Sequence, residues 1–240
     1  MNNMANKKIL IVMAHPDDGE FMAGAAIAHW AAQGADIYYS LMTNGDVGSS
    51  DPHMTSEALI ELRRNEAQEA ANRLGVQHPV IFFNQIDSQL THTLDIRRDL
   101  TRVIRQIQPD VIVTQDPSTY YHDRGYINHP DHRAVGDITF AAIMPSASTR
   151  LIFPELLDEG LEPHRVSELL LVNTNHRDYW IEVTTEDIEK QRNALLAHAT
   201  QVKEGPSLER LLQNAKSAAQ EARVHGHFFE YAASFKCFLF

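Results

Sequence analysis

The chain has 240 residues, of which 43% are hydrophobic and 22% are charged, and its formal net charge is −11. This composition indicates a folded protein of single-domain size, and the negative charge argues against a nucleic acid or an anionic membrane as partner. A single cysteine, Cys237, excludes an internal disulfide framework, and no apolar run approaches the about 20 residues of a membrane span. We therefore expect a cytoplasmic protein without a membrane-spanning segment.

Short apolar runs alternate with helical patterns through the first half of the chain. The apolar runs, several of them rich in β-branched or aromatic residues, predict strands over 8–13, 36–42, 79–83 and 110–114. The patterns between them predict helices over 20–33, 55–74 and 94–107. Alternation of strand and helix implies right-handed crossovers and a mostly parallel sheet with helices on both faces, which is an α/β fold.

The second half of the chain continues with strands and helices. Its patterns predict strands over Glu168–Asn173 and Tyr179–Val183, and helices over 184–203 and 207–224. No repeat or linker-like stretch interrupts the chain, so we expect one domain over 1–240. The connections 115–130 and 144–165 are long, and we expect them to outline a substrate pocket.

Two polar segments of similar composition follow predicted strands. Residues 15–18 are His-Pro-Asp-Asp and come directly after the first strand, whereas residues 129–132 are His-Pro-Asp-His and end the polar loop after strand 110–114. Ligands of open α/β sheets bind beyond the carboxyl ends of the strands, so both segments are expected at one rim. Imidazoles and carboxylates together are ligands that zinc prefers. Each segment alone could instead cap a helix, with Asp17 or Asp18 at one start and Asp131 at the other.

The paired segments resemble the signature of the PIG-L/LmbE family of zinc-dependent de-N-acetylases, nearest to its diacetylchitobiose deacetylase-like branch. The resemblance continues through 43–46 (Thr-Asn-Gly-Asp), 63–66 (Arg-Arg-Asn-Glu) and Asp87, and it is best from residue 8 to about 140. One departure is Gly19, where many members carry an acidic residue. The resemblance implies a Rossmann-like three-layer fold and removal of the acetyl group from an N-acetylated amino sugar, such as a GlcNAc-type glycoside.

The resemblance also implies the parts of an active site. His15, Asp18 and His132 would bind Zn²⁺ and leave a fourth position for water, and Asp17 would be the general base. If so, the imidazoles of His15 and His132 must lie within about 6 Å of each other, because zinc–nitrogen bonds reach only about 2 Å. His129 would be an imidazolium that stabilises the oxyanion and is oriented by the remaining aspartate, Asp131.

Two further residues are implied as substrate contacts. Arg63 interrupts the apolar stripe of helix 55–74, so it either reaches solvent or meets a buried partner. The resemblance favours a role in holding substrate. Asp87 would accept hydrogen bonds from sugar hydroxyls.

Other functions and other residues remain open at this point. An amidase acting on a sugar-thiol conjugate or another N-acyl amine would keep the metal site, whereas a non-enzymatic sugar- or nucleotide-binding protein would use the aspartates only as caps. The expected partner is a small N-acetyl sugar, and similar enzymes often form trimers or hexamers. Histidines outside the two segments are interpreted as packing or helix-face residues; these are His122, with the neighbouring Tyr120-Tyr121 pair, His198, His225 and His227.

Overall fold

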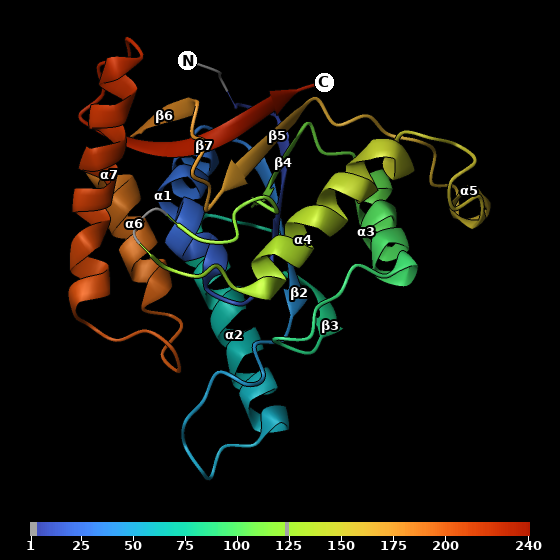
Figure 1. Cartoon of the computed structure of the whole chain (residues 1–240), viewed down its shortest axis with the longest axis horizontal. Coiled ribbons are helices and arrows are strands. Elements are labelled where there is room, and N and C mark those ends of the chain that lie inside the picture. Colours follow the sequence, from blue (N-terminus) through green and yellow to red (C-terminus); the bar gives the residue numbers. More distant parts are fainter. Residues whose placement is uncertain (1–3, 123–124) are drawn as a thin grey trace.

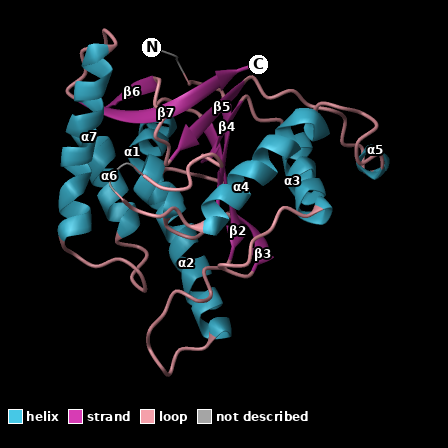
Figure 2. Ribbon diagram, in the orientation of Figure 1, coloured by secondary structure: helices cyan, strands magenta, loops and turns pink. Residues whose placement is uncertain are grey.

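The computed structural model of the chain describes residues 4–122 and 125–240, and a seven-stranded sheet forms its centre (Figures 1 and 2). The strands are β1 (Lys8–Met13), β2 (Asp36–Thr43), β3 (Ile81–Gln85), β4 (Val111–Gln115), β5 (Glu168–Val172), β6 (Tyr179–Val183) and β7 (Tyr231–Leu239). The helices are α1 (Asp18–Ala32), α2 (Ser56–Leu74), α3 (Leu94–Ile107), α4 (Pro130–Ala141), α5 (Glu155–Asp158), α6 (Thr185–Leu195) and α7 (Pro206–Val224), with a π-helical turn over Ala142–Ala147.

The sheet has the strand order β3-β2-β1-β4-β5-β7-β6. Strands β1 to β5 pair in parallel, whereas β7 runs antiparallel to both β5 and β6. The mostly parallel α/β sheet predicted from the alternating pattern is therefore confirmed. The order changes direction at β1, which has β2 on one side and β4 on the other, and such a reversal opens a crevice at the carboxyl ends of the strands.

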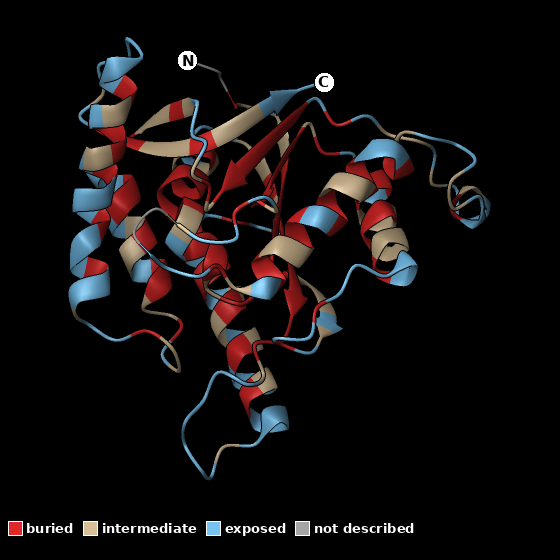
Figure 3. Cartoon of the chain, in the orientation of Figure 1, coloured by how far each residue is buried: buried red, intermediate tan, exposed pale blue. Residues whose placement is uncertain are grey.

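Strand β1 is buried on both faces, and Figure 3 shows the central strands as the most deeply buried part of the fold. Ile9 and Ile11 pack into a cluster with Trp30 of α1. Leu10 and Val12, which point the other way, belong to a second cluster built with α3 and α4. Packing against helices on both faces therefore fixes the position of the carboxyl end of β1. The first polar segment starts at this end.

The sequence pattern missed one strand and overestimated one helix. Strand β7 escaped prediction because it combines Ser234 and Lys236 with alanines and aromatics, and its strand character comes from lying between β5 and β6. The helix predicted over 184–203 ends at Leu195, since a turn follows in which Thr200 donates to Glu66 and Gln201 donates to Gly48. No helix in residues 4–122 and 125–240 has the length and apolar composition required to cross a membrane.

Candidate metal centre and active site

The two polar segments meet at the carboxyl edge of the sheet. Strands β1 and β4 are paired neighbours, and the His-Pro-Asp-Asp segment leaves β1 directly, whereas the connection after β4 leads to the start of α4. The ring centroids of His15 and His132 lie 5.3 Å apart, and the ring of His129 lies 4.6 Å from that of His15. The proximity that the metal hypothesis requires is met.

Asp18 lies between the two histidines that were predicted as ligands with it. Its Oδ2 is 3.1 Å from Nδ1 of His15, and its Oδ1 is 3.1 Å from Nε2 of His132. Two ligand atoms on one tetrahedral zinc ion are about 3.3 Å apart, because each bond is about 2.0–2.1 Å long. All three residues are buried. Donor types, spacing and burial therefore fit a divalent cation.

The second nitrogen of each imidazole faces a protein oxygen, as is usual for metal-bound histidines. Nε2 of His15 lies 3.1 Å from Oδ1 of Asp87 and 3.2 Å from Oδ2 of Asp131. Nδ1 of His132 lies 3.0 Å from Oδ1 of Asn128. If Nε2 of His15 and Nδ1 of His132 carry the protons, the other nitrogen of each ring has a free lone pair. These two lone pairs point towards Asp18.

Two other groups of potential ligands overlap this one. The ligand atoms of His15, His129 and His132 lie within 4.8 Å of one another, and so do those of a group formed by His15, Asp87, His129 and Asp131. In the group with Asp87 and Asp131, His15 would use Nε2, which faces those two carboxylates and not Asp18. We favour the Nδ1 side, since it leaves Asp87 and Asp131 to fix the ring of His15 from behind.

The electrostatics of the cluster demand a positive charge. Burial by itself lowers the pKa of His15, but Asp18, Asp131 and Asp87 outweigh it and raise the pKa to about 12. Burial by itself raises the pKa of Asp18, yet the charges of His132 and His15 hold that pKa well below its ordinary value. Without a metal ion the cluster therefore binds a proton at His15, and a divalent cation can replace that proton.

Asp17 is held in a strained backbone conformation with φ 96°, directly before α1. It occupies the cap position of α1, but its side chain makes no capping hydrogen bond, so the interpretation as a simple cap does not hold. Burial and the charge of Asp18 raise the pKa of Asp17 to about 7, against the opposing charges of Arg63 and His198. A carboxylate in this range can exchange protons near neutral pH.

His129, rather than Asp131, caps α4. Its Nδ1 accepts a hydrogen bond from the backbone N–H of Asp131, 3.3 Å away, which requires that nitrogen to be unprotonated. Burial and the charge of His15 also lower the pKa of His129. Both observations favour a neutral imidazole with a proton on Nε2, in place of the imidazolium expected from the sequence.

Asp131 is fully buried, and its carboxylate does not cap α4. It accepts hydrogen bonds from the backbone N–H groups of Ser88 (2.7 Å) and Leu90 (3.3 Å), and it faces His15. Asp131 therefore orients the ring of His15, whereas we had predicted that it orients His129. Asp87 also contacts His15, so sugar binding by Asp87 remains a prediction.

Arg63 enters the site from α2 and is 4% exposed. Its Nη1 donates to the carbonyl of Gly45 (2.8 Å), and its Nη2 donates to the carbonyl of Pro16 (2.5 Å) and approaches Oδ2 of Asp17 (3.3 Å). A Cβ at Gly45 would lie 2.2 Å from Nη1 of Arg63, so only glycine leaves room for the guanidinium there. Arg63 thus meets a buried partner, the second alternative left open by the sequence.

His198 differs from the prediction of a helix-face residue. It follows α6, is 0% exposed, and its Nε2 lies 3.6 Å from Oε2 of Glu20. Tyr39 donates to the same oxygen from 3.0 Å, and its hydroxyl occupies the space where a Cβ of Gly19 would lie. Neither Glu20 nor His198 belongs to a local motif. The packing of α1 against the turn after α6 brings both side chains close enough to Asp17 for their charges to act on its pKa.

The other histidines take part in packing. His225 stacks on Trp180 with ring centroids 4.6 Å apart, and His227 stacks on Phe229 at 5.5 Å. His122 stacks on Tyr126 at 5.7 Å. The Tyr120-Tyr121 pair, in contrast, is exposed rather than packed within its loop, with exposed fractions of 64% and 67%.

The segment 144–165 lies at the amino ends of the strands, whereas the candidate site lies at their carboxyl ends. The prediction that this segment outlines the substrate pocket is therefore wrong. Arg105 binds its carbonyls at Ser146 and Thr149, and His164 contacts the carbonyl of Pro109, which precedes β4. The cause is α4, which begins at the site and carries the chain away from it for 12 residues.

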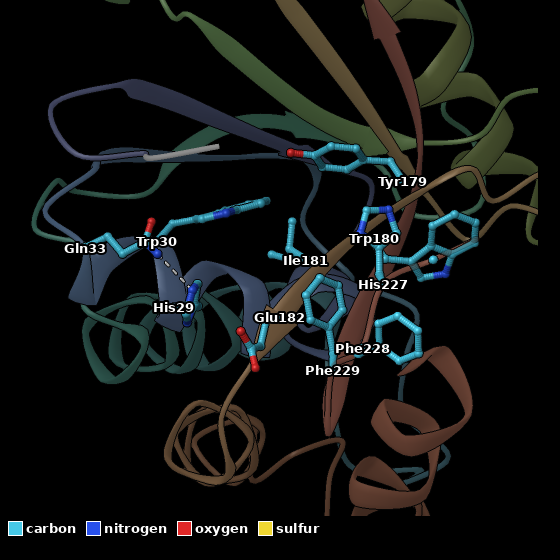
Figure 4. Close-up of a pocket in the computed structure, with 11 residues that line it drawn as sticks. His29, Trp30, Gln33, Tyr179, Trp180, Ile181, Glu182, His227, Phe228 and Phe229 are labelled. Atoms are coloured by element: carbon cyan, nitrogen blue, oxygen red, sulfur yellow. Dashed lines mark hydrogen bonds between the residues drawn. The ribbon is translucent and has the colours of Figure 1, made fainter. Parts of the chain in front are cut away.

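A cavity of about 510 Å³ lies apart from the metal cluster (Figure 4). It is lined by aromatic residues of β6 and of the turn after α7, and by Trp30, His29 and Gln33 near the end of α1. His29 stands 11 positions after Asp18, which corresponds to about 16 Å of helix, so this cavity is not part of the candidate active site.

Comparison with known proteins identifies the family. Residues 10–143 match the family described as GlcNAc-PI de-N-acetylase (PIG-L). The chain is 28% identical over 200 residues to the diacetylchitobiose deacetylase of Thermococcus kodakarensis, covering 82% of this chain and 71% of the relative. It is 30% identical over 281 residues to the 1D-myo-inositol 2-acetamido-2-deoxy-alpha-D-glucopyranoside deacetylase of Rhodococcus opacus, covering 94% and 91% of the two chains.

A solved structure agrees with this assignment. The N,N'-diacetylchitobiose deacetylase of Pyrococcus horikoshii superposes with a TM-score of 0.86 at 27% identity, over 97% of this chain and 84% of the other. The residues matched to the family include both polar segments and the sheet edge between them. The chain therefore belongs to the PIG-L family of de-N-acetylases.

Proposed function

We propose that this protein is a zinc-dependent hydrolase that removes the acetyl group from an N-acetylated amino sugar of the GlcNAc type. The observation that carries the proposal is the contact of Asp18 with both His15 and His132, together with the buried neighbouring carboxylate of Asp17, whose pKa the charge of Asp18 helps to raise. The relatives' substrates, diacetylchitobiose and a GlcNAc-inositol, share an N-acetylglucosamine unit, which supports the substrate class.

His15, Asp18 and His132 would hold the ion. A bound zinc ion would supply Lewis-acid polarisation of the amide and activation of water. Asp17 accepts the proton of the attacking water, for which its raised pKa suits it. His129 presents its Nε2–H beside the cluster, where it can donate a hydrogen bond to the developing oxyanion.

Arg63 and Asp131 act on these groups. The guanidinium of Arg63 fixes the peptide of Pro16 and the carboxylate of Asp17, and the carboxylate of Asp131 fixes the ring of His15. Such supporting contacts keep the catalytic side chains in the positions and orientations that hydrolysis requires.

The non-enzymatic alternative is weakened by the geometry. It required the aspartates to act only as helix caps, whereas the side chain of Asp17 makes no capping bond and that of Asp131 faces His15. An amidase acting on a sugar-thiol conjugate would use the same centre, and a substrate screen separates it from a GlcNAc-glycoside deacetylase. A cytoplasmic location, one domain over 1–240 and assembly as a trimer or hexamer remain parts of the proposal.

The test is an amine-release assay on zinc-loaded protein with N-acetylated sugars and conjugates, read out with fluorescamine. Asp17→Asn should keep about one zinc per chain and lose a factor of about 10²–10⁴ in kcat, the usual contribution of a general base. Asp158→Asn, at an exposed carboxylate of α5, is the matched control and should leave kcat unchanged. Unchanged turnover in Asp17→Asn would show that the assignment of the base is wrong.

A further inference from the structure

The cavity of about 510 Å³ at the end of α1 has no part in the proposed hydrolysis (Figure 4). One of its walls is the end of α1, and another is the turn between α7 and β7. Between them lie four consecutive residues of β6, Tyr179–Glu182, whose side chains alternate between the two faces of the strand. Since β6 is an outer strand of the sheet, the cavity lies along the outer edge of β6. We call it the aromatic cavity.

Aromatic rings form most of the lining of the aromatic cavity. Both tryptophans of the chain, Trp30 and Trp180, contribute to it. In Figure 4 Trp30 lies on one side of Ile181, and the aromatic residues of the turn after α7 lie on the other side. One of these, Phe228, is 78% exposed, so an incoming molecule can reach its ring from solvent. An occupant would therefore lie among aromatic faces, which attract apolar groups and also cations.

The polar residues of the lining add negative charge without a compensating cation. Among the described residues, no lysine or arginine lines the aromatic cavity, and Glu182 takes part in no ion pair. His29 is neutral, because its Nδ1 donates to Asp187 (2.9 Å) and its Nε2 accepts from the amide nitrogen of Gln33 (2.9 Å). The amide oxygen of Gln33 accepts from the backbone N–H of Met4, which fixes that orientation. The carboxylate of Glu182 is therefore an uncompensated charge, in a chain whose net charge is −11.

This charge decides between the ligands that aromatic walls accept. Glu182 repels a phosphate or a carboxylate. A neutral ring could fill the space, but it would take water away from the carboxylate of Glu182 and offer no partner in return, which is unfavourable. An organic cation pairs with the carboxylate and is also attracted by the faces of the aromatic rings. The volume lies within the range of small-molecule sites, about 300–1,000 Å³.

We propose that the aromatic cavity is a second ligand site and that it binds an organic ammonium ion. The cationic group contacts the carboxylate of Glu182 and the aromatic rings, and the apolar part of the ligand fills the rest of the cavity. Neither the ligand nor its contacts involve the predicted zinc ligands, so this inference does not rest on the proposed function.

The experiment is a titration of the zinc-loaded protein with choline at constant ionic strength, followed by tryptophan fluorescence. Because both tryptophans of the chain line the aromatic cavity, a saturable change in their fluorescence reports on this site. The comparison ligand is neohexanol, in which a carbon atom replaces the cationic nitrogen of choline. Choline should bind, and neohexanol should bind at least about 10-fold more weakly, because it has the same shape but no charge.

Two variants separate the contribution of the charge from that of the rings. Glu182→Gln should raise the Kd of choline at least about 10-fold and leave that of neohexanol within about 2-fold. Phe228→Ala should raise both Kd values about 2–5-fold, since it removes a ring from the wall. Glu209→Gln and Phe240→Ala make the same changes at exposed positions outside the aromatic cavity and should change neither value.

Three results would overturn the proposal. These are the absence of a saturable fluorescence change with choline, equal Kd values for choline and neohexanol, and a Kd of choline that Glu182→Gln leaves unchanged. The titration measures no turnover, so it decides on this site whether or not the protein releases amine from an N-acetylated sugar.

Discussion

Replacement of Arg63 by methionine tests whether this residue binds substrate, as the sequence predicted, or supports the base, as its contacts indicate. Methionine keeps much of the length and apolar surface of the side chain on α2 but removes the guanidinium. Three acceptors then lose their donor, namely the carbonyls of Pro16 and Gly45 and the carboxylate of Asp17.

The expected loss of stability follows from the burial of these groups. A buried acceptor left without a partner costs about 1–3 kcal/mol, and two carbonyls are affected. Asp17 loses its nearby positive charge but can take up a proton, which limits its share of the cost. We expect Arg63→Met to lower the free energy of unfolding by about 2–5 kcal/mol.

The catalytic effect should appear mainly in kcat. Without the guanidinium the pKa of Asp17 rises further, so the acidic limb of the kcat profile should move to higher pH. Arg63→Lys should recover part of the stability, because an ammonium keeps the charge but lacks the planar fork that reaches three acceptors.

The assays are urea unfolding of the zinc-loaded protein and steady-state amine release from pH 5 to 9. Arg64→Met is the matched control, since Arg64 is the next residue of α2, is half-buried and lies over the ring of Phe82. It should change stability by less than about 1 kcal/mol. If Arg63→Met leaves stability and kcat nearly unchanged but raises KM, this reasoning is refuted. Arg63 would then be assigned to substrate binding.

Three further predictions concern the metal cluster and its surroundings. Metal-free wild-type protein should lose stability relative to Asp17→Asn as pH rises from about 4 to 7, because the raised pKa of Asp17 makes the folded state bind more protons than the unfolded state in that range. In chemical denaturation at pH 8 the variant should be at least about 1 kcal/mol more stable than the wild type. Equal stabilities at pH 8 would contradict the buried environment of Asp17. His132→Ala should lower zinc content, measured by atomic spectroscopy, well below one ion per chain, whereas retention of full zinc would exclude His132 as a ligand. Gly19→Ala should lower the melting temperature through about 1–3 kcal/mol of overpacking, since its Cβ would lie 1.9 Å from the hydroxyl of Tyr39; Tyr39→Phe should restore part of the loss, and an undiminished loss would point to a different contact.

Much of the fold could be predicted from the sequence because its signals are local. The apolar run of β1 and the stripe of α3 have the periods of a strand and a helix, and the helix predicted over 94–107 is α3, Leu94–Ile107. Strand β7 lacked such a signal, since pairing with β5 and β6 rather than its own pattern makes it a strand.

The two polar segments could also be found by sequence alone, and the topology of alternating strands and helices was sufficient to expect them at one rim. What a local pattern does not contain is the direction of each side chain. His15 turns Nδ1 towards Asp18 because Asp87 and Asp131, from distant turns, contact its other nitrogen. The same holds for Arg63, whose acceptors follow β1 and β2.

The sequence by itself determined most of the strands and helices, the family and the residue types of the candidate metal centre, because burial periods and short motifs are properties of neighbouring residues. Only the tertiary structure decided that 144–165 lies at the amino ends of the strands, and that His198 is buried and close enough to Asp17 to act on its pKa. These depend on contacts between residues far apart in the chain, and such contacts are fixed by how whole helices pack on the sheet.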